Sequence, residues 1–256
     1  MIETTEFQPT WASPPGDTIS DLLEEKGWDQ AELSLRTGFS RKHVNELIQG
    51  KSPLSPAAAE RLSYVLGSTS AFWLSREAHY QASLERRRSI EAHRPDVPWL
   101  AELPLSWMIK QGWVQRFREK GEQVRAALTF FGVASVDAWR GKYAQPLAAF
   151  RASSAFDKKI GAVAAWLRQA EVEAAEVRCA PYDKRAFRAL LPALRALTLE
   201  SDPAVFIPSL REACAKVGVA VVFVPAPPGC PVHGVTRWLS PERAMLALSL
   251  RYRSND

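Results

Sequence analysis

Two short helical patterns separated by one glycine constrain the fold of this 256-residue chain more than any other feature. The first pattern spans Gln30–Thr37, and the second follows Ser40 as far as Gln49. Gly38 lies between them, and glycine takes a positive φ without steric cost, so a sharp turn is favoured there. Ser34 is small enough to let the two helices touch. The apolar residues expected to hold the pair on a third helix are Leu33, Val44 and Leu47.

Three more short helices are expected around this pair. Pro14-Pro15-Gly16 cannot continue a helix, so residues 1–16 are expected to form an extended arm. Asp17 can then act as the N-cap of the first helix, which Gly27 ends. The other two are expected from Ser55-Pro56 through Leu66 and from about Ser70 onward, with proline at the first helical position of the former.

The rest of the chain changes character twice. A very polar helical segment runs to Pro95, and Ala-, Trp- and Leu-rich helical patterns follow it. Short apolar runs come last, and they read as strands at 219–224, 235–239 and 245–250. The third has little β-branching, so a short helix is the alternative there. The sequence therefore predicts a mainly α protein with a small β portion. Its expected parts are an arm (1–16), a five-helix bundle (17–81), a helical linker (82–102), a helical middle region (103–201) and an α+β fragment (202–256).

The distribution of charge is more informative than its total. The formal net charge is +5, yet acidic residues outnumber Lys and Arg among the first 80 residues. Positive residues nevertheless gather in the short stretch that contains Arg36, Arg41, Lys42 and Lys51. Contact with phosphates depends on such a local face, so the acidic average does not argue against a nucleic-acid partner.

Several classes of protein are not favoured by this composition. No stretch approaches the roughly 18 consecutive apolar residues that a membrane span needs. The first residues lack the basic-then-apolar layout of a signal peptide. Three widely spaced cysteines do not suggest a disulfide framework. We therefore expect a cytoplasmic protein without a membrane partner.

The helical pair resembles the lambda-repressor/Cro (XRE) family of helix-turn-helix regulators. The residues that carry the resemblance are Gln30-Ala31-Glu32-Leu33-Ser34, Gly38, Ser40, Val44, Leu47 and Gly50. The resemblance implies a lambda-repressor-like bundle whose second helix of the pair enters the major groove of double-stranded DNA.

On that geometry the base-contacting residues would be Arg41, Lys42 and Asn45. Arg and Lys can donate to guanine, and Asn can pair with adenine through two hydrogen bonds. The residues expected to contact phosphates are Gln30, Ser40, His43 and Lys51. The alternative is that Arg41, Lys42 and Asn45 form an ordinary solvated helix face.

A narrower resemblance is to the HigA antitoxin branch of this family. It is carried by Gly50-Lys51, Leu54-Ser55, Leu62, Leu66-Gly67 and Ala71-Phe72-Trp73-Leu74. It implies a homodimer that binds its own operator and represses its operon, with a toxin protein as a further partner.

From about Asp202 onward the chain resembles the ImmA/IrrE family, through Leu210-Arg211-Glu212-Ala213, the run 219–224 and residues 234–239. Members of that family bind zinc with a His-Glu-x-x-His helix, in which the Glu activates the metal-bound water. No such motif occurs in this sequence, and its four histidines are isolated. We therefore expect no enzyme activity, no cofactor and no metal. The alternative is a regulator–metallopeptidase fusion whose zinc site lies beyond residue 256.

Two smaller expectations concern about the last 40 residues. Cys230 and His233 have a C-x-x-H spacing, but without a second ligand pair we interpret them as a loop thiol and a loop imidazole. The strands lack further helices after them in the sequence. We therefore expect their apolar surface to be unstable alone or covered by another chain.

Overall fold

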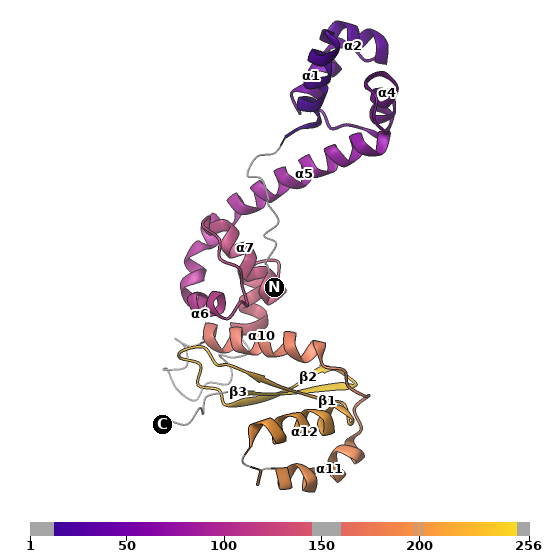
Figure 1. Cartoon of the computed structure of the whole chain (residues 1–256). Helices are drawn as coiled ribbons and strands as arrows, with labels where there is room; N and C mark the ends of the chain where they lie inside the picture. The colour runs from indigo at the N-terminus through magenta and orange to yellow at the C-terminus, as the bar shows by residue number, and fades with distance from the viewer. Residues whose placement is uncertain (1–12, 145–159, 198, 201, 250–256) are drawn as a thin grey trace. The chain divides into compact units, whose positions relative to one another are not determined.

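The computed structural model describes residues 13–144, 160–197, 199–200 and 202–249. The chain divides into two compact units, Met1–Ala92 and His93–Asp256 (Figure 1). Each unit has its own apolar core. The fold is mainly helical with one small sheet, as the sequence predicts.

The N-terminal unit is a bundle of five helices. They are α1 (Pro15–Lys26), α2 (Gln30–Thr37), α3 (Arg41–Ile48), α4 (Pro56–Leu66) and α5 (Ser70–Ala92). The start of α4 follows from local chemistry, since the Ser55 hydroxyl accepts a hydrogen bond from the Ala58 amide at 3.2 Å and Pro56 occupies the first turn. The core between the helices is built from aliphatic side chains and Trp73, whose indole N–H donates to the carbonyl of Gly67 at 3.1 Å.

The first helix begins earlier than expected. Pro14 is its N-cap and Pro15 its first residue, so residues 15 and 16 are helical and Asp17 is not the cap. Residues 1–12 of the expected arm lie outside the described residues. Proline is compatible with this position because the amides of the first turn have no intrahelical partner. Asp17 instead accepts a hydrogen bond from the Ser13 hydroxyl at 2.9 Å. Gly16 is buried where α1 meets the end of α3, and a β-carbon there would overlap the carbonyl of Ile48.

The fifth helix is much longer than expected. It continues without a break for 23 residues to Ala92, so the polar segment after Tyr80 is part of α5 and not a separate element. The expected linker 82–102 is accordingly divided between α5 and a 3-10 helix, η1 (Arg94–Glu102). Pro95 lies at the start of η1 and disfavours α-helical backbone in the residue before it.

The C-terminal unit begins with an aromatic helical cluster. Trp139 packs edge-on against Trp99 and Phe131, and Tyr143 lies against Phe131. The Tyr143 hydroxyl donates to the carbonyl of Phe131 at 3.1 Å. The helices of this unit are α6 (Leu105–Lys110), α7 (Lys120–Phe131), α8 (Val136–Trp139), η2 (Arg140–Ala144), α10 (Ile160–Glu176), α11 (Lys184–Leu197) and α12 (Pro203–Ala215).

A three-stranded sheet completes this unit. Its strands are β1 (Val219–Val224), β2 (Gly234–Ser240) and β3 (Arg243–Ser249), in the spatial order β1-β3-β2. β3 runs parallel to β1 and antiparallel to β2. The segment with little β-branching is therefore a strand, because a central strand gains both its backbone partners and two apolar faces.

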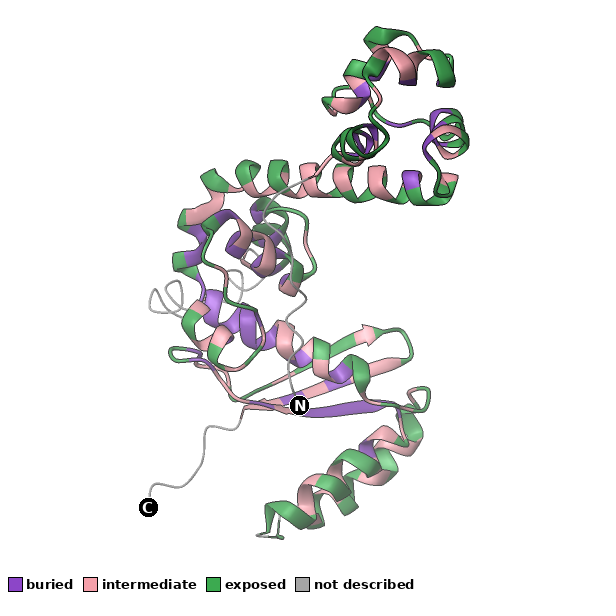
Figure 2. Ribbon diagram, turned by 45° about the horizontal axis from the view of Figure 1, so that its top comes forward, coloured by how far each residue is buried: buried purple, intermediate pink, exposed green. Residues whose placement is uncertain are grey.

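Both faces of the sheet are covered by helices of the same chain. α10 packs on one face with Ala162, Trp166 and Ala170, and the Trp166 indole donates to the carbonyl of Val224 at 3.0 Å. α11 and α12 lie on the other face (Figure 1). Burial is concentrated on β1 and the first half of α10, whereas β2 is mostly exposed (Figure 2). The expectation that the strands would lack a cover is therefore wrong, because the covering helices precede the strands in the sequence.

Within the described residues no helix combines the length and apolar character that a membrane crossing requires.

Candidate nucleic-acid interface

The connection between α2 and α3 is fixed by local hydrogen bonds. Gly38 is left-handed, with φ 71° and ψ 18°, and its amide donates to the carbonyl of Ser34 at 3.0 Å. The Ser34 hydroxyl donates to the carbonyl of Phe39 at 2.6 Å. Thr37, buried at the same turn, accepts from the Phe39 amide at 3.3 Å. These contacts leave the turn few alternative conformations, so α3 has a defined direction relative to α2.

The inner face of this pair is apolar and tightly packed. Leu33 and Val44 are 1% exposed and Leu47 is 4% exposed. They share one core with Ile19 of α1 and Leu62 of α4. α3 therefore packs against α1 and α2 through its inner face, while its outer face remains in solvent.

That outer face carries all three side chains predicted to contact bases. Arg41, Lys42 and Asn45 are exposed. Lys42 lies 3.8 Å from the Glu46 carboxylate, one turn further along α3. Asn45 accepts a hydrogen bond on Oδ1 from Nε2 of Gln49 at 3.0 Å. Arg41 has no ion pair among the described residues, so its guanidinium is the most available of the three groups.

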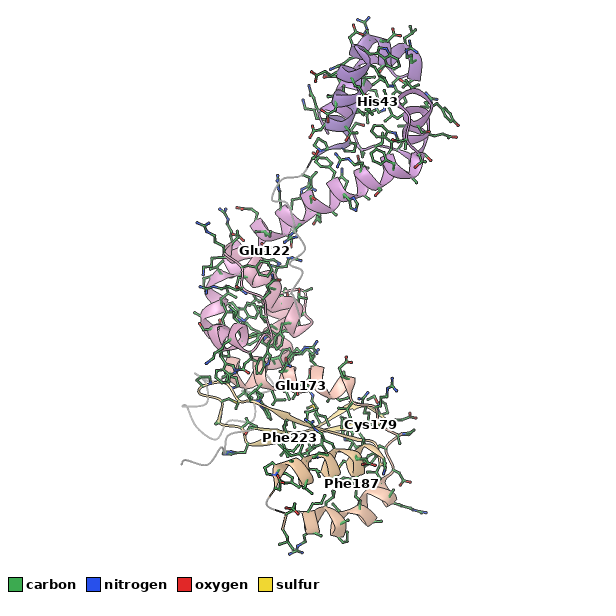
Figure 3. The ribbon with its side chains drawn as sticks, in the orientation of Figure 1. His43, Glu122, Glu173, Cys179, Phe187 and Phe223 are labelled. Carbon is green, nitrogen blue, oxygen red and sulfur yellow. The ribbon has the colours of Figure 1, made fainter. Side chains whose placement is uncertain are left out.

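The predicted phosphate contacts lie around the two helix starts and the end of α3. Gln30 is the exposed first residue of α2, and Lys51 is exposed just after α3. Ser40 caps α3, with its hydroxyl accepting from the His43 amide at 3.1 Å. His43 (labelled in Figure 3) is half-buried, and its ring packs edge-on against Phe39 at 5.0 Å between centroids.

Two further residues, Gln49 and Arg61, lie beside this surface, and Arg36 does not. Gln49 was not singled out from the sequence, although its spacing of four from Asn45 places the two on one helix face. Arg61 of α4 lies over the Phe39 ring at 5.6 Å, beside the turn. Arg36 is directed elsewhere, since it pairs with Glu32 at 2.7 Å and stacks over Trp28 at 4.1 Å.

The C-x-x-H pair, Cys230 and His233, is not part of a larger cluster of potential metal ligands in the described ranges. No group of three or more His, Cys, Asp or Glu side chains there is arranged to hold a metal ion. Cys230 is a buried residue of the loop between β1 and β2, and His233 is exposed.

Comparison with known families agrees with the geometry of the N-terminal unit. Residues 19–74 match the family HTH_3, described as "Helix-turn-helix". The N-terminal unit contains a helix-turn-helix domain. The match covers α2, α3 and α4, most of α1 and the first turn of α5, and it includes every predicted contact residue.

One relative named for a helix-turn-helix is similar to part of this chain. A protein of Escherichia coli (strain K12) named "Uncharacterized HTH-type transcriptional regulator YddM" is 28% identical over 80 residues, which is 31% of this chain and 84% of that protein.

Two solved structures are similar over about a third of the chain. One, from Nostoc punctiforme, is named as an antidote protein of a plasmid maintenance system. It is 23% identical with a TM-score of 0.32, over 32% of this chain and 91% of that one. The other is an addiction module antidote protein of a HigA family from Coxiella burnetii. It is 19% identical with a TM-score of 0.30, over 33% of this chain and 92% of that one.

Proposed function

We propose that this protein is a transcriptional regulator that binds double-stranded DNA sequence-specifically through α3. The observation that carries the proposal is the exposed polar face of α3 on a helix pair whose turn and core are fixed. A rigid support matters because base readout requires donors and acceptors to be held in position in the major groove. The name of the Escherichia coli relative, an HTH-type transcriptional regulator, supports the same assignment.

In this proposal the residues of α3 contribute unequally. Arg41 donates to O6 and N7 of a guanine, and Asn45 pairs with an adenine. Gln49 is a positioning residue, because its hydrogen bond leaves the Asn45 amide with its oxygen and nitrogen in a fixed orientation. Lys42 contributes less discrimination, since the Glu46 carboxylate offsets part of its charge.

We assign Gln30, Ser40, His43 and Lys51 to phosphate contacts. Gln30 and Ser40 lie at helix N-termini, where the positive end of the helix dipole favours an anion. Lys51 supplies a mobile charge just beyond α3. These contacts set the register on the duplex and carry no sequence information themselves.

Binding as a homodimer to a two-fold operator, and neutralisation of a toxin, are the finer parts of the proposal. They rest on the HigA-like residues around Gly50-Lys51 and Ala71–Leu74. A small reading frame directly beside the gene, with a product that co-purifies with this chain, would support the antitoxin role. A footprint confined to an unrelated promoter would contradict autoregulation.

We further propose that these 256 residues are not catalytic. The sequence contains no His-Glu-x-x-His motif, which the resembled ImmA/IrrE peptidases use to hold zinc. Incubation with zinc and a candidate repressor substrate should give no cleavage. The alternative, a fusion with a metallopeptidase, predicts that motif in the coding sequence shortly after Asp256.

The decisive experiment selects operator sequences with the full chain and then compares Arg41→Ala with Lys51→Ala. Losing Arg41 should cost about 1–3 kcal/mol of discrimination at one base pair. Losing Lys51 should weaken binding to all sequences alike and reduce the salt slope by about one. Arg188→Ala, on the exposed surface of α11, is the matched control and should change neither. An unchanged base preference in Arg41→Ala would contradict the assignment of α3.

The positioning role of Gln49 has its own readout. Gln49→Ala should relax the preference for adenine while leaving the guanine preference set by Arg41 intact. Gln49→Lys retains a donor within reach of Asn45 Oδ1 and should restore part of the adenine preference. A loss of affinity that is equal for all sequences in Gln49→Ala would indicate a structural role instead.

A further inference from the structure

A hollow of about 450 Å³ opens on the C-terminal unit between α10 and the β2–β3 hairpin. α10 contributes Arg168 and Glu171 to its wall, and the hairpin contributes Arg237 and Arg243. Lys142 of η2 completes the charged lining. Figure 1 shows α10 packed along one face of the sheet.

The lining is strongly cationic. Four of its side chains carry positive charge, and Glu171 is its one carboxylate. Glu171 already forms two ion pairs. One carboxylate oxygen lies 2.6 Å from Arg237, and the other lies 3.5 Å from Arg168. Lys142 lies over the Tyr143 ring at 5.5 Å and has no carboxylate partner among the described residues. The hollow therefore has an excess of positive charge that the described part of the protein does not neutralise.

Two of the cations are held in place by neutral groups. Arg168 donates through Nε to the carbonyl of Phe130 at 2.7 Å. Arg243 donates to the carbonyls of Ala174, Ala175 and Val177 at the end of α10. A carbonyl fixes a guanidinium without cancelling its full charge. Both groups are thus ordered before any ligand arrives, which lowers the entropic cost of binding.

One donor of Arg243 lacks a hydrogen-bond acceptor. Nε of Arg243 is buried and has no hydrogen-bond partner in the described part of the chain. Buried polar atoms without partners are rare, because each loses its hydrogen bonds to water and gains none within the protein. This nitrogen is buried and is not exposed to the hollow, so the groups available to a ligand are the other atoms of the cationic side chains.

We propose that this hollow binds a small polyanion, a molecule bearing phosphate or several carboxylates. Guanidinium groups match the planar, multiply accepting edges of such oxyanions, and a lysine adds a mobile point charge. A volume of this size is within the range of small-molecule sites, about 300–1,000 Å³. The site goes beyond DNA binding, because it would make the C-terminal unit the part of the regulator that detects a metabolite.

The test uses calorimetric titration of the full chain with two probes, inorganic pyrophosphate and citrate. Saturable binding of either probe supports the proposal. The probe that binds more tightly indicates whether the natural ligand carries phosphate or carboxylate groups. Lys142→Gln removes a charge without breaking an ion pair, and it should weaken binding about tenfold, the effect of losing one charged hydrogen bond. Lys110→Gln on the exposed end of α6 removes the same charge outside the hollow and should leave binding unchanged. Absence of binding, or equal loss in both variants, would overturn the proposal.

A second pair of variants addresses the alternative that the hollow holds the phosphates of a DNA backbone. Arg237→Gln should weaken probe binding, and Arg188→Gln should not. Affinity for a duplex without the operator sequence, read by fluorescence anisotropy, should be alike in these two variants. If Arg237→Gln loses duplex affinity but keeps the probe, the surface is a DNA contact and the proposal fails. Neither result depends on whether α3 reads bases.

Discussion

Gly16→Ala offers a sharp test of how α3 is held. Gly16 is the second residue of α1 and is buried against the end of α3. A β-carbon at this position would overlap the carbonyl and α-carbon of Ile48, which are backbone atoms. No side-chain rotation can relieve such an overlap, so α1 and α3 must move apart.

The expected free-energy change combines two opposing terms. Replacing glycine by alanine in a helix stabilises it by up to about 1 kcal/mol through the unfolded state. Overpacking costs about 1–3 kcal/mol, and a clash with backbone belongs near the upper end of that range. The sum is a destabilisation of about 2 kcal/mol, which corresponds to a roughly 30-fold larger population of the opened N-terminal unit.

Amide hydrogen exchange of the full chain, read by mass spectrometry, localises this effect. Peptides from α1 and α3 should exchange faster in Gly16→Ala, whereas peptides from α10 and the sheet should not change. Gly141→Ala is the control, because a β-carbon at Gly141 has no atom within 4 Å. Unchanged or increased protection of α3 in Gly16→Ala would refute the close approach of the two helices.

Three further substitutions have defined outcomes. Ser40→Ala removes the N-cap of α3 and should cost about 1 kcal/mol, seen as faster amide exchange confined to the first turn of that helix. Trp166→Phe removes the hydrogen bond to the Val224 carbonyl and leaves a void, so the free energy of unfolding should fall by about 2–4 kcal/mol in urea titrations. Burial raises the pKa of Tyr143 to about 12 from an ordinary 10.0. The unfolded state thus releases this proton first, and stability should fall as pH rises between these two values. Tyr143→Phe removes the hydrogen bond to the Phe131 carbonyl, so the free energy of unfolding at pH 9 should fall by about 1 kcal/mol. The variant should also lack the part of the loss of stability above pH 10 that comes from Tyr143.

The helices of the N-terminal unit could be predicted because their signals are local. A cap such as Ser40, a turn glycine such as Gly38 and the spacing of Val44 and Leu47 all act within a few residues. The start of α1 was predicted three residues late, with Asp17 in place of Pro14 as the N-cap, for a related reason. Pro14-Pro15-Gly16 is a breaker inside a helix but is compatible with the first turn, and only the packing of Gly16 shows which applies.

The missed features depend on distant parts of the chain. α10 precedes the sheet it covers by more than 40 residues, and nothing in the strands themselves identifies their cover. The pair between Arg237 and Glu171 joins residues 66 positions apart. The hollow beside that pair therefore has no signature in the linear sequence. On α3, by contrast, the exposure of Arg41 and Asn45 follows directly from the helical period.

The contacts made by the middle of α5 bear on how much chain a portable DNA-binding module needs. The recognised motif stops at residue 74, yet Arg76 donates to the Ser13 hydroxyl at 3.1 Å. The Tyr80 hydroxyl lies against Gly50, directly after α3. Through these two side chains, α5 contacts both the beginning of α1 and the end of α3. A fragment that ends at residue 74 would lose both contacts, so the shortest fragment that retains them extends past Tyr80.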